Sequence, residues 1–180
     1  MPVAVIREVA IENLRYRGGL RYVKGEKEPF NGKEITPRHD GTKWIEMPYV
    51  NGKRHGTKIW YEDDGRIWSE TPYVEGIRQG VAIKYYKDGT RKSEEPWANG
   101  IRVGSGIEYR EDGSIEKEVE YADNMRSEIW YREDGSIVKE SWEDGKKVSL
   151  ILLQPKQDSE AKKTLPPSTT KDAPEVTIGD

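Results

Sequence analysis

Apolar and polar residues alternate in short runs along this chain, and the pattern repeats from Tyr49 onward. Copies begin at Tyr49, Tyr73 and Trp97, 24 residues apart, and a shorter fourth copy begins at Tyr121. Alternation with a period of two is typical of strands, and an Asp-Gly pair between two such runs is a strong signal for a β-hairpin. We therefore predict one hairpin per copy. The Asp-Gly pairs are Asp64-Gly65, Asp88-Gly89, Asp112-Gly113 and Asp134-Gly135.

A second glycine-containing stretch joins each hairpin to the next. Its pairs are Asn51-Gly52, Glu75-Gly76 and Asn99-Gly100, each with a further glycine four residues later. Glycine and asparagine provide the backbone freedom for turns on the opposite edge. The fourth copy has lost two residues in this stretch, at Asp123-Asn124, but keeps its hairpin half.

This regular repeat predicts the fold class. A period of 20 to 50 residues indicates an array whose units bury apolar surface only against their neighbours. The chain has 33% hydrophobic and 35% charged residues, too few apolar side chains for a deep two-layer core. We therefore expect an all-β protein: consecutive antiparallel hairpins in one elongated, twisted, single-layer sheet.

The length of the turn at Asp64-Gly65 decides which residues face each other. A two-residue loop would set Ile59 against Glu70, an apolar residue against a charge. We favour a three-residue loop over residues 63–65, with Gly65 left-handed in a bulge. The cross-strand pairs expected from this loop are Tyr61 with Ile67, Trp60 with Trp68, and Lys58 with Glu70.

This register predicts one packed face and one charged face. The packed face would hold Ile59, Tyr61, Ile67 and Tyr73 and their equivalents in later copies. The charged face would hold a column of carboxylates two strands apart, roughly 9 to 10 Å, which is too far for a shared ion. We interpret this column as solvated surface charge rather than as a metal or acid-base site. Its members are Glu46, Glu70, Glu94, Glu118 and Glu140.

The chain ends differ from the repeat. We divide the sequence into a capping segment with a divergent first repeat (residues 1–48), the array with a final strand (49–153) and a disordered tail rich in Lys, Ser, Thr and Pro (154–180). Within the cap, Gly18-Gly19 predicts a hairpin turn, and Pro37 replaces the usual aromatic residue. Residues 1–13 fit either a strand or a short helix.

Composition and motifs exclude several functions. A net charge of -3 without a basic patch argues against a nucleic-acid partner. The sequence has no run of 18 apolar residues and no polybasic cluster, the two features that would indicate membrane contact. Cysteine is absent, and His39 and His55 have no catalytic partner at a recognisable spacing. We predict no enzymatic activity, no metal site and no cofactor.

The repeat motif resembles a known family. The pattern Y-x-N-G-K-x-x-G followed by W-Y-x-x-D-G-x-x-x-S-E is similar to the bacterial variant of the MORN repeat, the family of the YwqK-type antitoxins, from Tyr49 to about Lys147. Residues 19–25 and 28–33 also resemble the family's leader segment. The resemblance implies a non-enzymatic array of hairpins. In some members such arrays neutralise a toxin, and in others they are linked to membranes or scaffolding.

Three tryptophans are the candidate binding residues. The expected register places Trp44, Trp60 and Trp68 together on the charged face, with Lys58 and Glu70 beside them. Exposed aromatic groups anchor protein interfaces, but they also stabilise sheets by covering one another, and the sequence leaves both interpretations open.

Two functions follow from these features. The first is an antitoxin-like or immunity-like module that binds another protein, and the second is a structural or envelope scaffold without a toxin partner. Sheet edges near residues 1–13 and 148–153 could pair with a second copy or with a strand of another protein. The opening residues lack a signal peptide's features, so we expect a cytoplasmic protein, or an envelope-attached or periplasmic one if a leader precedes this chain.

Overall fold

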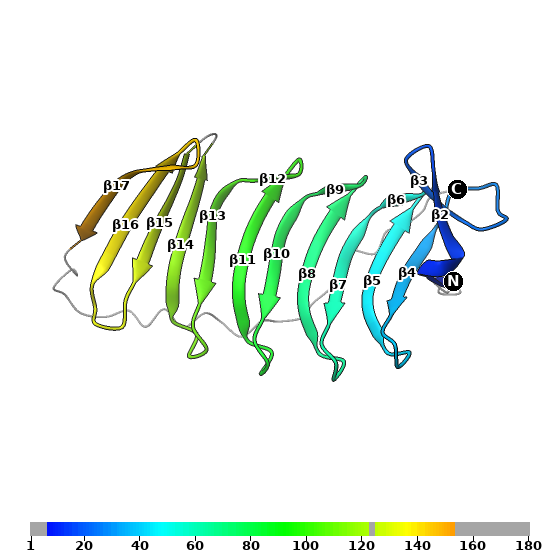
Figure 1. Ribbon diagram of the computed structural model, residues 1–180, viewed down its shortest axis with the longest axis horizontal. Helices are drawn as coiled ribbons and strands as arrows, with labels where there is room; N and C mark the ends of the chain where they lie inside the picture. Colours follow the sequence, from blue (N-terminus) through cyan, green and yellow to red (C-terminus); the bar gives the residue numbers. More distant parts are fainter. Residues whose placement is uncertain (1–6, 123–124, 154–180) are drawn as a thin grey trace, which may run out of the picture.

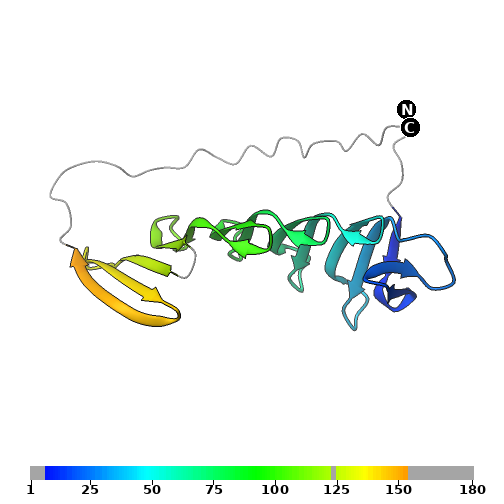
Figure 2. The same cartoon turned by 90° about the horizontal axis from the view of Figure 1, so that it is seen from above.

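The computed structural model describes residues 7–122 and 125–153, and this part of the chain is an array of hairpins. The strands lie side by side nearly in chain order (Figure 1). Seen from above, the array is a thin single layer that thickens at its first end, and β15 to β17 tilt away from the other strands (Figure 2). The predicted all-β, single-layer fold is confirmed. The predicted disordered tail from Gln154 lies outside the described residues.

Of the strands in the described residues, fifteen form one sheet and two form a separate hairpin. Among these strands only β1 runs parallel to its neighbour, β4. The main path is β1 (Glu8–Ala10), β4 (Gly32–Pro37), β5 (Lys43–Val50), β7 (Gly56–Tyr61), β8 (Ile67–Val74), β10 (Gly80–Tyr85), β11 (Arg91–Ala98), β13 (Gly104–Tyr109), β14 (Ile115–Ala122), β15 (Met125–Tyr131), β16 (Ile137–Glu143) and β17 (Lys146–Leu153). Short connector strands are β6 (Lys53–Arg54), β9 (Ile77–Arg78) and β12 (Ile101–Arg102), and the separate hairpin is β2 (Leu14–Arg17) with β3 (Leu20–Val23).

The Asp-Gly turns have the predicted three-residue loop. The backbone N–H of Glu62 donates to the carbonyl of Arg66 at 2.8 Å, and that of Gly65 donates to the carbonyl of Glu62 at 3.0 Å. Gly65 is left-handed, with φ of 83°. The Asp64 carboxylate accepts the N–H of Arg66 at 3.1 Å, so the side chain closes the turn. Equivalent bonds recur at Asp40, Asp88, Asp112 and Asp134.

These turns should make the fold sensitive to acid. Hydrogen bonds from residue i+2 lower the pKa of each turn aspartate below its ordinary value of 3.8. A lowered pKa stabilises the fold above about pH 4, and this contribution is lost as the pH falls through the folded-state values. We expect Asp88→Asn with Asp112→Asn to reduce the loss of stability between pH 5 and pH 3, because asparagine still accepts the bond but does not titrate. Urea unfolding at both pH values measures this.

The matched control for the acid experiment is Glu111→Gln, which removes an exposed loop carboxylate that accepts no hydrogen bond within the described chain. An unchanged acid response in the double asparagine variant would contradict the role assigned to the turns.

Beyond the turn, the predicted register is wrong. Tyr61 pairs with Ile67 as expected, but Trp60 pairs with Ser69, so Trp68 is an extra residue in a β-bulge. The next pairs are therefore Ile59 with Glu70 and Lys58 with Thr71. A bulge places two residues opposite one and moves every later residue of the strand to the other face. The sequence prediction included the bulge at Gly65 but not this second bulge, at Trp68 in β8.

The bulge also corrects the predicted faces. Tyr73 lies on the same face as Trp60, whereas Glu70 lies with Ile59 on the other. On that second face Glu70 stands between Ile59 and Ile83, and its carboxylate accepts a hydrogen bond from the Tyr85 hydroxyl at 3.0 Å. Glu70 therefore links neighbouring hairpins instead of projecting into solvent.

The connectors form a second regular ladder. Asn51 and Gly52 have φ of 48° and 76°, the signature of a tight hairpin turn with both central residues left-handed. The Gly76 N–H donates to the carbonyl of Arg54 at 2.8 Å, so each connector is bonded to the preceding one. The Arg78 guanidinium lies 4.5 Å from the centre of the Trp97 ring, a cation–π contact that recurs with Arg102 and Arg126.

The fourth copy departs from this pattern because its connector is shorter. β14 and β15 pair continuously from Lys117 with Trp130 to Ala122 with Met125. β15 and β16 pair without a bulge, so Glu140 faces Glu128 and Leu150. The sequence prediction placed Glu140 in the same row as Glu118. This is wrong, because Glu140 does not continue that row. The pairing of β14 with β15 keeps the register of the earlier copies, with Glu118 opposite Ile129, and the change comes where β15 pairs with β16 without a bulge.

A small core closes the first end of the array. Phe30 is 2% exposed and packs against Tyr49 at 5.8 Å between ring centres. The core residues are Val9, Leu14, Val23, Phe30, Met47, Tyr49 and Tyr73. Residues 8–13 contain both alternatives left open above, a short strand and a 3-10 turn (Ile11–Asn13). The hairpin predicted at Gly18-Gly19 is confirmed.

Polar bonds hold this cap against the sheet. The Arg21 side chain donates to the Glu34 carboxylate at 2.7 Å, and both groups are buried. The Arg21 N–H donates to the carbonyl of Gly52 at 2.9 Å. A Cβ on Gly52 would lie 2.9 Å from that of Leu20, so the approach of β3 requires a glycine there.

Candidate functional site

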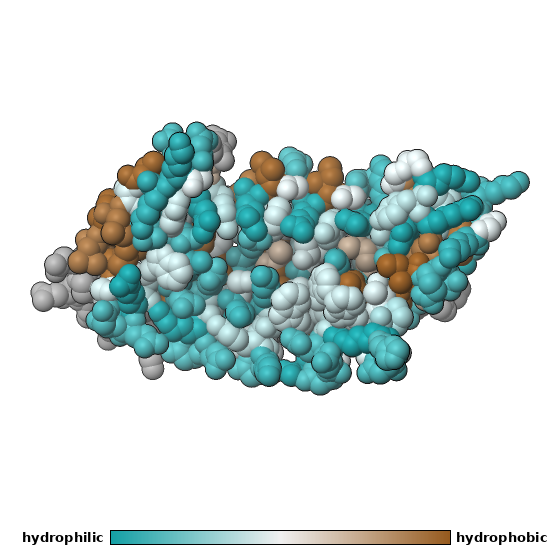
Figure 3. All heavy atoms as spheres, viewed as in Figure 1, coloured by the Kyte–Doolittle hydropathy of each residue, from teal (hydrophilic) through white to brown (hydrophobic). Residues whose placement is uncertain are grey.

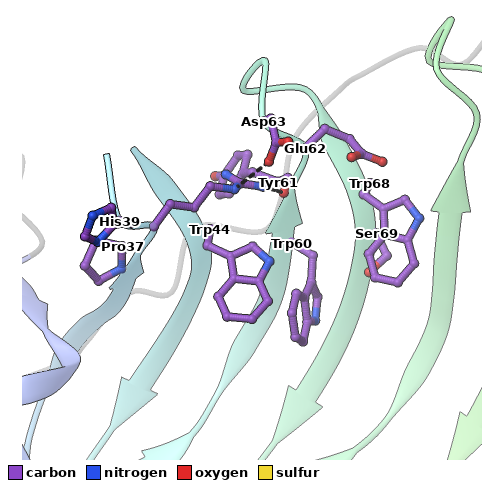
Figure 4. A pocket seen from close by; sticks show the side chains of 10 residues that line it. Pro37, His39, Trp44, Trp60, Tyr61, Glu62, Asp63, Trp68 and Ser69 are labelled. Atoms are coloured by element: carbon purple, nitrogen blue, oxygen red, sulfur yellow. Dashed lines mark hydrogen bonds and ion pairs between the residues drawn. The ribbon is translucent and has the colours of Figure 1, made fainter. Parts of the chain in front are cut away.

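The three tryptophans of the sequence prediction lie together on one face. Trp44 and Trp68 occupy the same bulge position in β5 and β8, and Trp60 stands between them on β7. The ring centres of Trp44 and Trp60 are 5.3 Å apart at 80°, and those of Trp60 and Trp68 are 6.1 Å apart at 86° (Figure 4). We call Trp44, Trp60 and Trp68 the tryptophan cluster. Trp60 is nearly perpendicular to both of its neighbours, so the cluster has two angular notches.

An open hollow of about 960 Å³ lies over the cluster. Its wall is completed by the Arg38 guanidinium, which pairs with Asp63 at 2.8 Å and donates to the carbonyls of Lys43 and Tyr61. Arg38 thus joins the first two hairpins at their loop ends. The hollow is lined by Pro37, Arg38, His39, Trp44, Trp60, Tyr61, Glu62, Asp63, Trp68 and Ser69 (Figure 4).

Two ammonium groups lie against the indoles. Lys58 Nζ is 4.2 Å from the centre of the Trp60 ring, and Lys84 Nζ is 5.9 Å from that of Trp68. Burial lowers the pKa of Lys58, with the nearby Arg54 and Arg78 guanidinium groups adding to the effect. The Glu62 carboxylate makes no hydrogen bond or ion pair within the described chain, and it lines the same hollow.

The structure places four of the five predicted residues together. Trp44, Trp60, Trp68 and Lys58 share one face, but Glu70 lies on the other, where burial and the adjacent carboxylate raise the pKa of its partner Tyr85 to about 12. The expected pairing of Lys58 with Glu70 is wrong for the reason given above: the bulge at Trp68 turns Glu70 away.

Sequence reasoning missed the loop residues of the hollow. Arg38, His39 and Asp63 come from two hairpin loops that only sheet pairing brings together. The available signal was the spacing of Trp44 and Trp68, which differ by one repeat and so had to lie two strands apart on one face.

The cluster offers binding surface rather than reactive groups. Trp44 is 42% exposed and Trp68 40%. Their indole N–H groups and that of Trp60 make no hydrogen bond within the described chain, whereas those of Trp97 and Trp130 donate to Glu95 and Glu128. Across residues 7–122 and 125–153 no three acidic or histidine side chains gather as a metal site. No helix there is long and apolar enough to cross a membrane.

Comparison with known proteins supports a MORN-type repeat. Residues 54–75 and 78–99 match the MORN repeat variant family, and residues 97–115 match the MORN repeat family. The first two matched segments run from the end of a connector strand through the next hairpin, and the third runs from the end of β11 to the start of β14. No curated protein and no solved structure matches the chain. Repeats of this type are generally structural or binding modules rather than enzymes.

Proposed function

We propose that this chain is a non-enzymatic repeat module that binds a partner protein through the tryptophan cluster. The observation that carries the proposal is the exposure of Trp44, at 42%, and Trp68, at 40%, in a cluster whose three indole N–H donors make no hydrogen bond within the described chain. Exposed, contiguous aromatic surface with unused donors is characteristic of interface anchors. The backbone pairing of β5, β7 and β8 places the three rings side by side before any partner binds, which lowers the ordering cost of binding.

An antitoxin or immunity role is the specific form of this proposal. Its support is the resemblance of the repeat to the bacterial MORN variant, together with a site that can bind protein and has no reactive group of its own. In this role the chain would neutralise a toxic partner by covering it. Toxicity of a neighbouring gene product that is suppressed by this chain, but not by its Trp60→Ala variant, tests that form.

Loss of the anchors should weaken partner binding strongly. Alanine at a central aromatic anchor costs about 2 kcal/mol or more, roughly 30-fold in Kd. We expect this loss for Trp60→Ala and Trp68→Ala with circular dichroism unchanged. The matched control is Trp142→Ala, which removes an indole from β16 at the far end of the array.

Site-specific photo-crosslinking tests the location independently. A crosslinking amino acid at His39, inside the hollow, should capture the partner. One at Lys87, in an exposed loop of the third hairpin, should not. Equal capture at both positions, or normal binding by both tryptophan variants, would place the interface elsewhere.

One feature favours the scaffold alternative. β17 is an edge strand whose apolar side chains are exposed, among them Leu150 at 63% and Leu152 at 68%. They appear as the hydrophobic patch at one end of the molecule (Figure 3). An unpaired apolar edge is suited to pairing with the same edge of a second copy.

For the scaffold alternative we expect concentration-dependent dimers that dissociate in Leu150→Lys with Leu152→Lys, because charges on an edge strand oppose pairing. Light scattering across a dilution series measures this. A monomer at every concentration in the unmodified chain would remove the support for self-assembly.

A further inference from the structure

We propose that the tryptophan cluster recognises a proline-rich segment of its partner, bound as a polyproline II helix that crosses β5, β7 and β8. This inference rests on the proposed function and gives the chemistry of the bound segment. Three observations support it: the spacing of the rings, the unused indole donors and the distribution of charge around the hollow.

The spacing of the rings matches the period of the ligand. Trp44 and Trp68 stand on β5 and β8, two strands apart in the sheet, which is about 9.5 Å at the usual strand separation. A polyproline II helix repeats every three residues, a rise of about 9.3 Å. A proline-rich segment running across the strands would therefore present the same face twice, once against Trp44 and once, one turn later, against Trp68.

The donors match the ligand's acceptors. A polyproline II helix has no internal hydrogen bonds, and prolines have no N–H, so its backbone presents only carbonyl acceptors. The three indole N–H groups of the cluster are donors without partners in the described chain. Proline rings pack on exposed aromatic surfaces, and aromatic-lined grooves recognise such segments in other folds.

The charges favour proline over a cationic ligand. A cage for a quaternary ammonium ion also needs aromatic rings, but Lys58 and Lys84 already lie against Trp60 and Trp68. A third cation between these rings would be repelled. The free carboxylate of Glu62 lies at the border of the hollow, so we place a basic residue of the ligand there, flanking the prolines rather than inserted among the indoles.

The test is a titration of the full chain with an acetylated hexaproline peptide that ends in arginine, followed by NMR of the indole N–H signals. We expect Trp44, Trp60 and Trp68 to shift, while Trp97 and Trp130 stay in place as internal controls. Alternating alanines in the peptide should abolish the shifts. Trp44→Ala should weaken binding at least tenfold, and Trp142→Ala should not.

Glu62→Gln tests the orientation of the peptide. It should weaken binding of the arginine peptide severalfold and leave a peptide ending in neutral citrulline unaffected. Equal effects on both peptides would overturn the assignment of the basic residue to Glu62.

Two results would overturn the inference. If the hexaproline peptide shifts no indole signal while the crosslink at His39 still captures the partner, the ligand is not proline-rich and the proposed function survives. If replacing Pro166 and Pro167 by alanine shifts the cluster's signals without any peptide, the occupant is the chain's own tail and not a partner. Failure of both the peptide and the crosslink would remove the proposed function as well.

Discussion

Replacing Phe30 by alanine should lower the free energy of unfolding by about 3 to 5 kcal/mol, which is the usual cost of deleting a fully buried aromatic side chain. Phe30 is 2% exposed and is the centre of the core that closes the first end of the array. The rest of the sheet is a single layer and has no second layer to compensate for a cavity. Domains are stable by only 5 to 15 kcal/mol, so this loss is severe.

Urea denaturation followed by circular dichroism measures the effect. Phe30→Leu should cost less, because it leaves a smaller cavity. The matched control is Ile101→Ala, which removes an apolar side chain that is 65% exposed and should change stability by less than about 0.5 kcal/mol. Similar losses for Phe30→Ala and Ile101→Ala would show that stability is spread evenly along the array rather than concentrated in the cap.

Removing Glu34 should have an effect of the same order, about 3 kcal/mol or more. Its carboxylate lies 2.6 Å from the Arg21 guanidinium, and the two side chains are only 11% and 10% exposed. Glu34→Ala leaves Arg21 charged, buried and without its partner, and breaking a buried pair is costly because of that unpaired charge. Thermal and urea unfolding measure the loss.

A double variant separates the pair's own contribution from the cost of the orphaned charge. Arg21→Met with Glu34→Leu removes both charges and keeps their volume, so it should recover much of the stability lost in Glu34→Ala. The control is Glu26→Ala, which breaks the exposed pair with Arg7 and should cost far less stability than Glu34→Ala, because solvent screens that pair. A double variant no more stable than Glu34→Ala would show that the pair itself, rather than the unpaired charge, stabilises the cap.

Both cap variants bear on the candidate site. The cap holds β4 and β5 through Glu34, Met47 and Tyr49, and β5 carries Trp44. Local opening of the first end would therefore move Trp44 while leaving Trp60 and Trp68 on better supported strands. We expect binding at the cluster to weaken in these variants before the later hairpins unfold.

Much of the candidate site could be anticipated from the repeat. Trp44 and Trp68 differ by one period, so any register consistent along the array puts them on one face, and the structure agrees. Glu70 could not be placed, because its face depends on a bulge two residues earlier. Residues 66–71 contain no glycine or proline to signal that bulge. The prediction assumed that Glu70 would not stand opposite the apolar Ile59. That pairing is tolerated, because the Tyr85 hydroxyl of the next hairpin donates a hydrogen bond to the Glu70 carboxylate.

Local chemistry in the sequence determined the hairpins, their order and the turns at Asp64-Gly65 and Asn51-Gly52, because each depends on a few adjacent residues. The tertiary structure alone decided which face each side chain occupies after a bulge, how the cap packs on Phe30, and how loops two strands apart enclose the hollow. These features arise from contacts between residues that are distant in the chain, and such contacts leave no periodic trace in the sequence.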